Sequence, residues 1–242
     1  MNKPPFAASV SVIVPAMNEA ENLPHVFATL PDWIDEVILV DGNSTDDTVA
    51  VARGLRPDLR VVVQTRRGKG NALIEGFQAA RGDIIVMIDA DGSTDGREIH
   101  SFVTALVDGA DFAKGSRHAP GGGSDDLSAI RSLGNKALTT LTNLLYGTRY
   151  TDLCYGYNAF WAHHLDALGL DCDGFEIETL MNVRAAQAGL VIREIPSHER
   201  SRIHGDSNLH AVRDGWRVLK TIMRERSRGT AVAPQRQVAL AK

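Results

Sequence analysis

The chain has 242 residues, of which 43% are hydrophobic and 23% charged, and its formal net charge at pH 7 is −4. This length and apolar content are enough for one α/β domain with a full core, and the acidic balance gives no overall nucleic-acid footprint. No apolar run approaches the ~18 residues of a membrane span, and no signal peptide is apparent, so we expect a cytoplasmic protein. Its two cysteines, Cys154 and Cys172, form no CxxC pattern and are expected to be reduced.

The first half alternates between strand and helix patterns. We expect strands near 10–14, 36–41, 60–64, 83–89 and 111–114. We expect helices between them, near 19–30, 46–54, 69–80 and 96–107. Alternation of this kind predicts an α/β fold with a Rossmann-like, doubly wound and mostly parallel sheet flanked by helices.

The second half changes character. Helices are predicted near 127–146, 175–188 and 208–226, with short strands near 155–161 and 190–195. No linker separates the halves, so 9–226 is predicted to be a single domain after an N-terminal extension at 1–8. The stretch 227–242 contains Gly229 and Pro234 and has little periodicity, which is typical of a mobile tail.

Two carboxylates follow the most apolar of the predicted strands. The run 84–88 has no polar residue, which is typical of a buried parallel strand, and it leads into Asp89-Ala90-Asp91. Open α/β sheets bind ligands at the carboxyl ends of their strands. Hard carboxylate oxygens suit Mg²⁺ or Mn²⁺, which often clamp phosphates of a substrate. The alternative is a solvated turn in which an Asp serves as a cap.

Polar residues also follow two other strands. Asp41 ends the second strand, and the first strand leads into Pro15, Asn18 and Glu19. Because the ends of parallel strands meet at one edge of a sheet, the three segments are expected to form one polar cleft for a nucleotide and a metal.

Basic residues make a second set of candidates. Lys69 lies in a Gly-rich segment that lacks P-loop spacing, and Arg117, Arg131 and Arg202 each flank a predicted strand or helix end. Guanidinium groups match phosphate oxygens with paired donors. The alternative for each of these residues is a solvated surface charge.

These motifs together resemble a known family. The segments 12–19, 40–48 and 89–91 are similar to those of family 2 glycosyltransferases with the GT-A fold. The segments 115–117, 174–178 and 200–207, together with Arg131, Asn135, Asp152 and Tyr157, resemble the dolichol- or polyprenyl-phosphate mannosyltransferase branch. The resemblance covers about 9–226. It implies a nucleotide-binding N-terminal half and an acceptor-binding C-terminal half.

The resemblance also implies a reaction and a set of site residues. A nucleotide-diphospho-sugar, UDP- or GDP-linked, would donate its sugar with inversion to a polyprenyl phosphate or another phosphorylated acceptor. Mg²⁺ or Mn²⁺ would bind Asp89 and Asp91, and the third metal ligand is left open because Gly92-Ser93-Thr94 follows. The donor and its metal are assigned to Pro15, Asn18, Glu19, Asp41, Lys69, Asp89, Ala90, Asp91, Arg117, Arg131 and Arg202.

Catalysis is assigned to Asp91, Asp152, Arg117 and Arg202. An anionic phosphate acceptor needs little general base, whereas a hydroxyl acceptor would need one from Asp152 or from the Glu176 and Glu178 pair. Two other functions remain open: transfer to a soluble phosphorylated or natural-product acceptor, and non-catalytic binding of a sugar nucleotide. Oligomeric state is not predicted.

The last predicted helix has two readings. Leu209, Val212, Trp216, Leu219 and Met223 would form an apolar face beside basic residues at 213, 217, 220 and 224. That face could lie on anionic lipid as a peripheral contact at the inner side of a membrane. Alternatively, it packs on the core and leaves the basic side in solvent.

Overall fold

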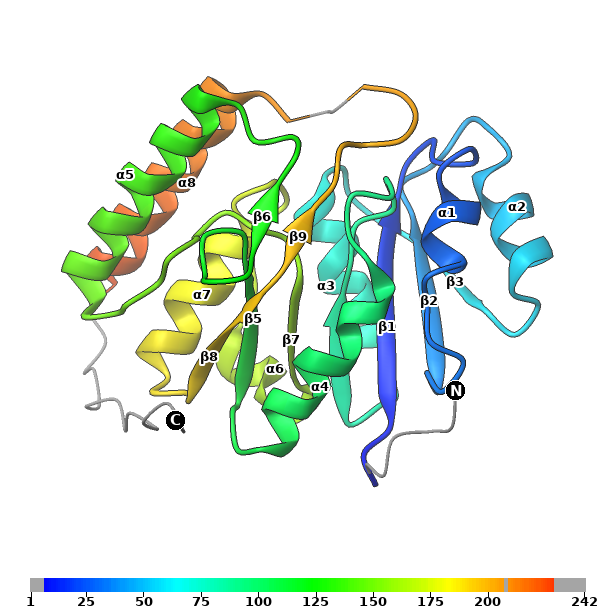
Figure 1. Ribbon diagram of the computed structural model, residues 1–242, viewed down its shortest axis with the longest axis horizontal. Coiled ribbons are helices and arrows are strands. Elements are labelled where there is room, and N and C mark those ends of the chain that lie inside the picture. The colour runs from blue at the N-terminus through cyan, green and yellow to red at the C-terminus, as the bar shows by residue number, and fades with distance from the viewer. Residues whose placement is uncertain (1–6, 207–208, 229–242) are drawn as a thin grey trace.

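The computed structural model describes residues 7–206 and 209–228. A central sheet is built from β1 (Val10–Ala16), β2 (Glu36–Asp41), β3 (Arg60–Val63), β4 (Ile84–Met87), β5 (Phe112–Ser116), β7 (Asn158–Trp161) and β8 (Ile192–Pro196). The seven strands lie in the order β3-β2-β1-β4-β7-β5-β8, as Figure 1 shows. Neighbours in β3-β2-β1-β4 are parallel, as are β5 and β8, whereas β7 runs antiparallel to both β4 and β5. The mostly parallel sheet predicted from the sequence is confirmed.

Helices cover both faces of this sheet. They are α1 (Leu23–Phe27), α2 (Thr48–Leu55), α3 (Lys69–Ala79), α4 (Ile99–Val107), α5 (Ala129–Tyr146), α6 (Leu165–Leu168), α7 (Ile177–Gln187) and α8 (Ala211–Ser227), with 3-10 turns η1 (Gly96–Glu98) and η2 (Ala162–His164). One core cluster joins the sheet to α1, α2 and α4, and another joins it to α3, α6 and α7. Burial on both faces explains why the central strands read as continuous apolar runs.

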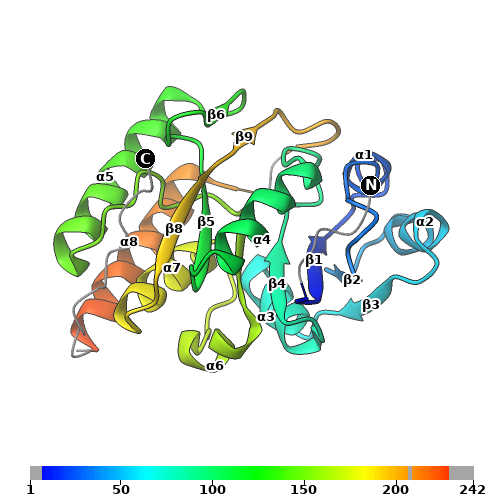
Figure 2. The same ribbon diagram turned by 60° about the horizontal axis from the view of Figure 1, so that its bottom comes forward.

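A third core cluster lies beyond the sheet. Tyr146, Val183, Val218 and Ile222 pack together where α5, α7 and α8 meet. Helices α5 and α8 lie side by side, and both begin at the end of the molecule where the parallel strands finish (Figures 1 and 2). This cluster holds the helix pair against the rest of the domain.

The second half also contains a small sheet that the sequence patterns do not predict. Strands β6 (Gly123–Ser124) and β9 (His198–Glu199) pair in parallel. The paired residues Ser124 and Glu199 are 75 residues apart along the chain. This pairing and the Ser124 hydroxyl bond to Glu199 anchor the Gly-rich stretch 120–124.

Two helix predictions need correction. The predicted helix 19–30 is only α1, because Pro24 occupies its first turn and the chain before it forms a separate turn. Of the two readings of the last helix, the one in which its apolar side packs on the core is wrong. Val212, Trp216 and Met223 are exposed, and α8 instead buries Asp214, Val218, Thr221, Ile222 and Glu225. The predicted tail falls almost wholly outside the described residues, although α8 reaches Ser227.

Candidate active site

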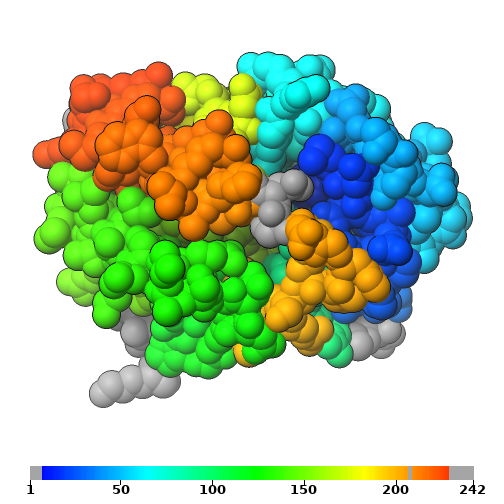
Figure 3. All heavy atoms as spheres, turned by 90° about the horizontal axis from the view of Figure 1, so that it is seen from above, coloured from blue at the N-terminus to red at the C-terminus, as the bar shows by residue number. Residues whose placement is uncertain are grey.

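A cavity of about 970 Å³ lies at the carboxyl ends of the parallel strands. Figure 3 views this end of the molecule and shows it hollowed between segments of the N-terminal half and segments that include α5 and α8. The sequence-predicted residues that line the cavity are Pro15, Asn18, Glu19, Lys69, Asp89, Ala90, Asp91, Arg117, Arg131, Glu178 and Arg202. The structure thus brings together side chains spread from the first strand to the loop after β9.

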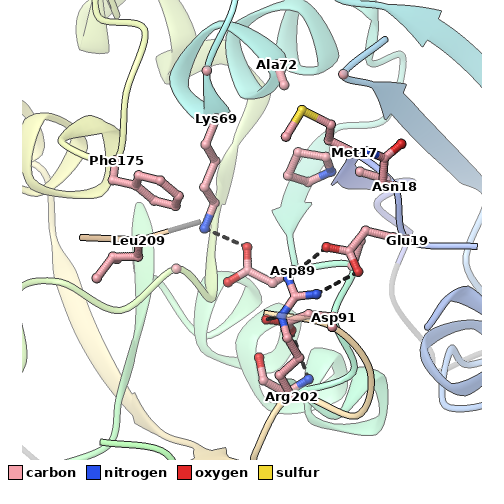
Figure 4. A pocket seen from close by; sticks show the side chains of 18 of the residues that line it. Met17, Asn18, Glu19, Lys69, Ala72, Asp89, Asp91, Phe175, Arg202 and Leu209 are labelled. Carbon is pink, nitrogen blue, oxygen red and sulfur yellow. Dashed lines mark hydrogen bonds and ion pairs between the residues drawn. The ribbon is translucent and has the colours of Figure 1, made fainter. Parts of the chain in front are cut away.

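Asp89 and Asp91 lie at the centre of the cavity (Figure 4). They follow β4, which pairs with β1 and β7 and therefore delivers them to the middle of the sheet edge. Asp91 accepts a hydrogen bond from the backbone N–H of Ser93 at 3.0 Å, which orients its carboxylate. The Asp89 carboxylate instead forms an ion pair with Lys69, with 2.5 Å between Oδ1 and Nζ.

Lys69 joins Asp89 to a second carboxylate. Its ammonium lies 2.8 Å from Glu178, a buried residue in the first turn of α7. Burial disfavours the charged ammonium, but the two carboxylates outweigh that cost and raise the pKa of Lys69. Burial also raises the pKa of Glu178 against the attraction of Lys69. The three groups form a compact charged cluster, and a Cβ at Gly156 would lie only 2.9 Å from the Lys69 Nζ.

Gly68 places Lys69 at the start of α3. Its φ is 113°, in the region that favours glycine, and a Cβ there would lie 2.1 Å from the carbonyl oxygen of Asp173. The Gly-rich segment therefore serves close packing of α3 against the loop before α7, and this packing directs Lys69 into the cavity.

Arg202 faces the acidic side of the cavity. Its guanidinium binds Glu19 in a bidentate pair, with nitrogen–oxygen distances of 2.7 and 3.0 Å. Its Nε lies 3.7 Å from Asp91 and has no hydrogen-bond partner within the described residues. Asn22 supports Glu19 and also accepts from the His204 backbone, which ties the loop after β9 to the N-terminal half. Glu19 thus positions Arg202 beside the Asp-x-Asp motif.

Arg117 and Asp152 form a different arrangement. Arg117 is buried, donates two side-chain hydrogen bonds to Asp152, and contacts Glu199 through Nη1. Asn135 on α5 donates to the same Asp152 carboxylate at 2.8 Å. Desolvation would raise the pKa of Asp152, but the hydrogen bonds and charge of Arg117, together with Lys114, hold it well below its ordinary value.

This network makes Asp152 a poor proton acceptor, because its strongly lowered pKa favours the ionised form and both oxygens are engaged. Arg117 borders the cavity with its three donor nitrogens already paired. Their predicted catalytic roles stay predictions. These contacts form a buried ion-pair network that joins the end of β5 to α5 and β9.

Three predicted site residues remain to be placed: Arg131, Asn18 and Asp41. Arg131 near the start of α5 pairs with Asp126 at 2.8 Å and is partly exposed in the cavity wall. The Asn18 side chain accepts from the Thr45 backbone at 2.7 Å and so joins the ends of β1 and β2. Asp41 is buried and accepts from the Ser44 backbone; the residues after it, rather than its own carboxylate, line the cavity.

The sequence reasoning missed several residues that line the cavity. They are Met17, Asn43, Gln64, Tyr155, Phe175, Ser201 and Leu209. Gln64 directly follows β3, so the rule applied to the other strand ends would have found it. Phe175 and Leu209 lie on the opposite side of Lys69 from Met17 in Figure 4. They carry no polar signal, and only the fold places them there.

The cleft, with acids at the strand ends facing basic groups, has the features of a site for an anionic nucleotide ligand. Residues 11–168 match the model of Glycosyl transferase family 2, and the chain belongs to this family. It is a glycosyltransferase of the GT-A fold.

Curated relatives agree with this assignment. Glycosyltransferase AglJ of Haloferax volcanii is 30% identical, and the alignment covers 91% of this chain and 73% of that protein. Undecaprenyl-phosphate mannosyltransferase of Micrococcus luteus is 34% identical over 83% of this chain and 87% of its own length. Polyprenol monophosphomannose synthase of Mycolicibacterium smegmatis is also 34% identical, over 76% and 75%. The resemblance to the polyprenyl-phosphate branch is thereby confirmed.

The fold is shared with solved structures. A complex of glucosyl-3-phosphoglycerate synthase from Mycobacterium tuberculosis with Mn²⁺, UDP and product superposes with a TM-score of 0.72. It is 22% identical, and the match covers 94% of this chain and 86% of that one. Within the described ranges, this chain has no helix that is both long and apolar enough to cross a bilayer.

Proposed function

We propose that this chain transfers a sugar from a UDP- or GDP-linked donor to a polyprenyl phosphate, with inversion at the sugar carbon. The observation that carries the proposal is the pair Asp89 and Asp91, which shares one cavity with Lys69, Arg131 and Arg202. The names of the Micrococcus and Mycolicibacterium relatives support the lipid acceptor.

The cavity suits a hard divalent cation, Mg²⁺ or Mn²⁺. Among the residues described, no group of three or more His, Cys, Asp or Glu side chains is arranged to hold a metal alone. Mg²⁺ commonly binds one or two carboxylates and takes further ligands from substrate phosphates and water. Asp89 and Asp91 fit that role. When bound with the donor, the ion would stabilise negative charge on the leaving diphosphate.

Basic side chains of this chain would stabilise the remaining negative charge on the diphosphate and on the acceptor phosphate. A phosphate oxygen of the acceptor forms the new bond to the sugar carbon as the bond from that carbon to the diphosphate breaks. Lys69 and Arg202 can donate to the diphosphate oxygens, and Arg131 at the α5 side can hold the acceptor phosphate. The acceptor oxygen is already anionic, so no residue need remove a proton from it.

We assign Asp152 to positioning rather than to proton transfer. It anchors Arg117 and Asn135, and through Glu199 the network reaches the segment that leads to Arg202. A protein of this kind would act in the cytoplasm, at the inner face of the membrane that holds its lipid acceptor.

The test is a donor and acceptor panel. UDP- and GDP-sugars are each incubated with Mg²⁺ or Mn²⁺ and with either a short-chain polyprenyl phosphate or a soluble phosphorylated acceptor such as phosphoglycerate, and products are identified by mass. A glycosylated polyprenyl phosphate is expected. Product only on the soluble acceptor would replace the lipid proposal with the second candidate, which the phosphoglycerate-acting structural neighbour motivates. Donor binding without any product would indicate a non-catalytic protein.

A further inference from the structure

Helices α5 and α8 expose six large apolar side chains to solvent. Each is between 51% and 87% exposed: Ile130, Leu133 and Leu144 on α5, and Val212, Trp216 and Met223 on α8. The two helices pack against each other, so the six residues lie on neighbouring helices. We call these six residues the α5–α8 apolar set. Single exposed apolar residues are common, but a group concentrated on two neighbouring helices is typical of an interaction surface.

Both helices keep large apolar side chains in solvent, although each also packs apolar residues on the third core cluster. On α5, the exposed Ile130, Leu133 and Leu144 are spaced so that they share one side. The buried residues of the opposite side are mostly polar: Asn135, Thr139, Thr142 and Tyr146. A surface helix normally buries its apolar side, so the outward apolar side of α5 is not explained by folding of the domain.

Helix α8 repeats the pattern. Val212, Trp216 and Met223 lie on one side at helical spacing, and Asp214 and Glu225 are among the buried residues of the other. The buried carboxylates are compensated: Glu225 pairs with Arg184 of α7 at 3.0 Å. The helix thus buries Val218 and Ile222 together with these paired carboxylates, and it leaves Val212, Trp216 and Met223 exposed.

A basic row flanks the apolar side of α8. Arg213, Arg217 and Lys220 follow one another at three- and four-residue spacing, and all are exposed. The ammonium of Lys220 lies 5.7 Å from the centre of the Trp216 ring. An aromatic and aliphatic surface bordered by Lys and Arg matches the interface of a bilayer with anionic headgroups. It would be less suited to a second copy of the same face, which would bring two basic rows together.

The position of the two helices links this surface to the cavity. Leu209, two residues before the start of α8, and Arg131, in the first turn of α5, both line the cavity. Both helices begin at the end of the molecule that carries the cavity (Figures 1 and 2). A lipid lying along the apolar set could thus extend its phosphate toward Arg131 without leaving the bilayer.

We propose that the α5–α8 apolar set and its basic row are a docking surface for a bilayer containing anionic lipid. This inference rests on the proposed lipid acceptor and names the surface through which the enzyme reaches it. Apolar side chains enter the boundary between headgroups and acyl chains, while Arg213 and Lys220 contact lipid phosphates.

The test is binding of the whole chain to vesicles of phosphatidylcholine alone or mixed with phosphatidylglycerol. Binding to the anionic vesicles is expected, with a blue shift of tryptophan fluorescence that Trp216→Phe abolishes. The double variant Leu144→Ser/Val212→Ser should bind at least tenfold more weakly. Its control, Leu55→Ser/Val107→Ser, removes two other exposed apolar side chains, 44% and 45% exposed, from α2 and α4 and should bind like the parent.

Charge is tested separately. Each of Arg213→Gln and Lys220→Gln should weaken binding to anionic vesicles about fivefold, the effect of about 1 kcal/mol per basic residue near a charged membrane surface, and should leave binding to neutral vesicles unchanged. Unchanged binding of nucleotide donor by every variant serves as the check on folding.

The outcomes separate this inference from the proposed function. Vesicle binding that depends on the apolar set, without transfer to polyprenyl phosphate, supports the docking surface and overturns the acceptor. Transfer to polyprenyl phosphate in detergent by a parent protein that binds no vesicle overturns the docking surface alone. A concentration-dependent dimer that Leu144→Ser/Val212→Ser dissociates would show that a second copy occupies the surface, and would also overturn the inference.

Discussion

Asp89 and Asp91 each face a basic side chain, and this pairing determines how the cleft can receive a charged donor. Lys69 pairs with Asp89, while Arg202 lies near Asp91 and is held by Glu19. A metal and a diphosphate bring opposite charges, so they can exchange with these contacts without leaving a carboxylate or an ammonium unpaired. Glu178 and Glu19 remain as anchors for the two basic groups.

Glu178 gives the first prediction at this scale. Glu178→Gln keeps the size of the side chain but removes the charge that holds Lys69 in the cavity. We expect kcat/KM to fall roughly tenfold or more, because Lys69 is less well positioned for the diphosphate. Glu176→Gln is the matched control, since Glu176 is a neighbouring acid that forms no ion pair with Lys69 among the described contacts. Equal losses for both variants would remove Glu178 from the positioning role.

Arg202 gives the second prediction for a single residue. Arg202→Ala should lower kcat/KM clearly, and Arg202→Lys should restore only part of it, because a lysine cannot reproduce the bidentate pair with Glu19 while its charge faces Asp91. Steady-state kinetics with a fixed acceptor measure both variants. Parent-like kinetics of Arg202→Ala would make this arginine a structural partner of Glu19 only.

Asp152 gives a prediction about pH and stability. Its pKa is lower in the folded chain than in the unfolded one, so its stabilising contribution is full above the unfolded pKa of about 3.9 and is lost as the pH falls below it. Asp152→Asn should destabilise the protein by about 3 kcal/mol at pH 7, because it leaves Arg117 buried with one carboxylate fewer. Between pH 5 and pH 3, the free energy of unfolding should fall less for Asp152→Asn than for the parent.

Denaturant unfolding at pH 7, 5 and 3 measures both effects. Asp58→Asn, at an exposed carboxylate in a surface pair with Arg56, is the control and should follow the parent at all three pH values. A parallel pH dependence of Asp152→Asn and parent would contradict the assignment of the lowered pKa to Asp152.

At the scale of elements, the sequence predicted the strands of the sheet better than the environment of the helices. The strands β1, β2 and β4 of the first half are buried on both faces, so their apolar runs define them without further information. The face that α8 buries could not be found this way. Val212, Trp216 and Met223 are on the outside, and the buried Glu225 has a partner, Arg184, that only the fold brings near. The buried Asp214 accepts from the backbone N–H of His210, four residues earlier.

The site was predictable to a similar degree. Asp89, Asp91 and Glu19 could be predicted as site residues because they follow strands whose carboxyl ends meet at one edge of the sheet. The pairing of Arg117 with Asp152 and Glu199 spans up to 82 residues and needs the β6–β9 sheet, which has only two residues per strand. Such short strands carry no periodicity from which they could be predicted.

Attachment of α8 is testable through its ion pair with α7. Glu225→Gln should destabilise the protein by about 2 kcal/mol, because Glu225 is buried and Arg184 loses its charged partner. Asp171 partly compensates, since it also pairs with Arg184 at 2.9 Å. Thermal unfolding measures the change, and Glu75→Gln on α3 is a control whose partner Thr65 is uncharged. No difference between the two variants would show that other contacts hold α8.

In the whole molecule, the cavity has two sides, which are formed by different elements. The β1, β2 and β4 ends and the start of α3 form the side with Asp89, Asp91 and Lys69, while α5, the loop after β9 and the start of α8 form the side that carries Arg131 and Arg202. In the proposed reaction, the first side would take the donor nucleotide with its metal, and Arg131 of the second side would take the acceptor phosphate. Arg202 pairs with Glu19 and lies near Asp91, so it would act on the donor. Residues of both sides meet over Asp91.

The central claim is that the carboxylates of the cleft bind a nucleotide-diphospho-sugar together with a divalent cation. Calorimetric titration of UDP- and GDP-sugars into the parent and into Asp89→Asn and Asp91→Asn, with Mn²⁺ and then with excess chelator, tests it directly. We expect one nucleotide class to bind the parent at least tenfold more tightly with Mn²⁺, and either substitution to remove this gain while the thermal unfolding transition stays cooperative. Donor binding that is equally tight in chelator, or a full metal effect in both variants, would contradict it.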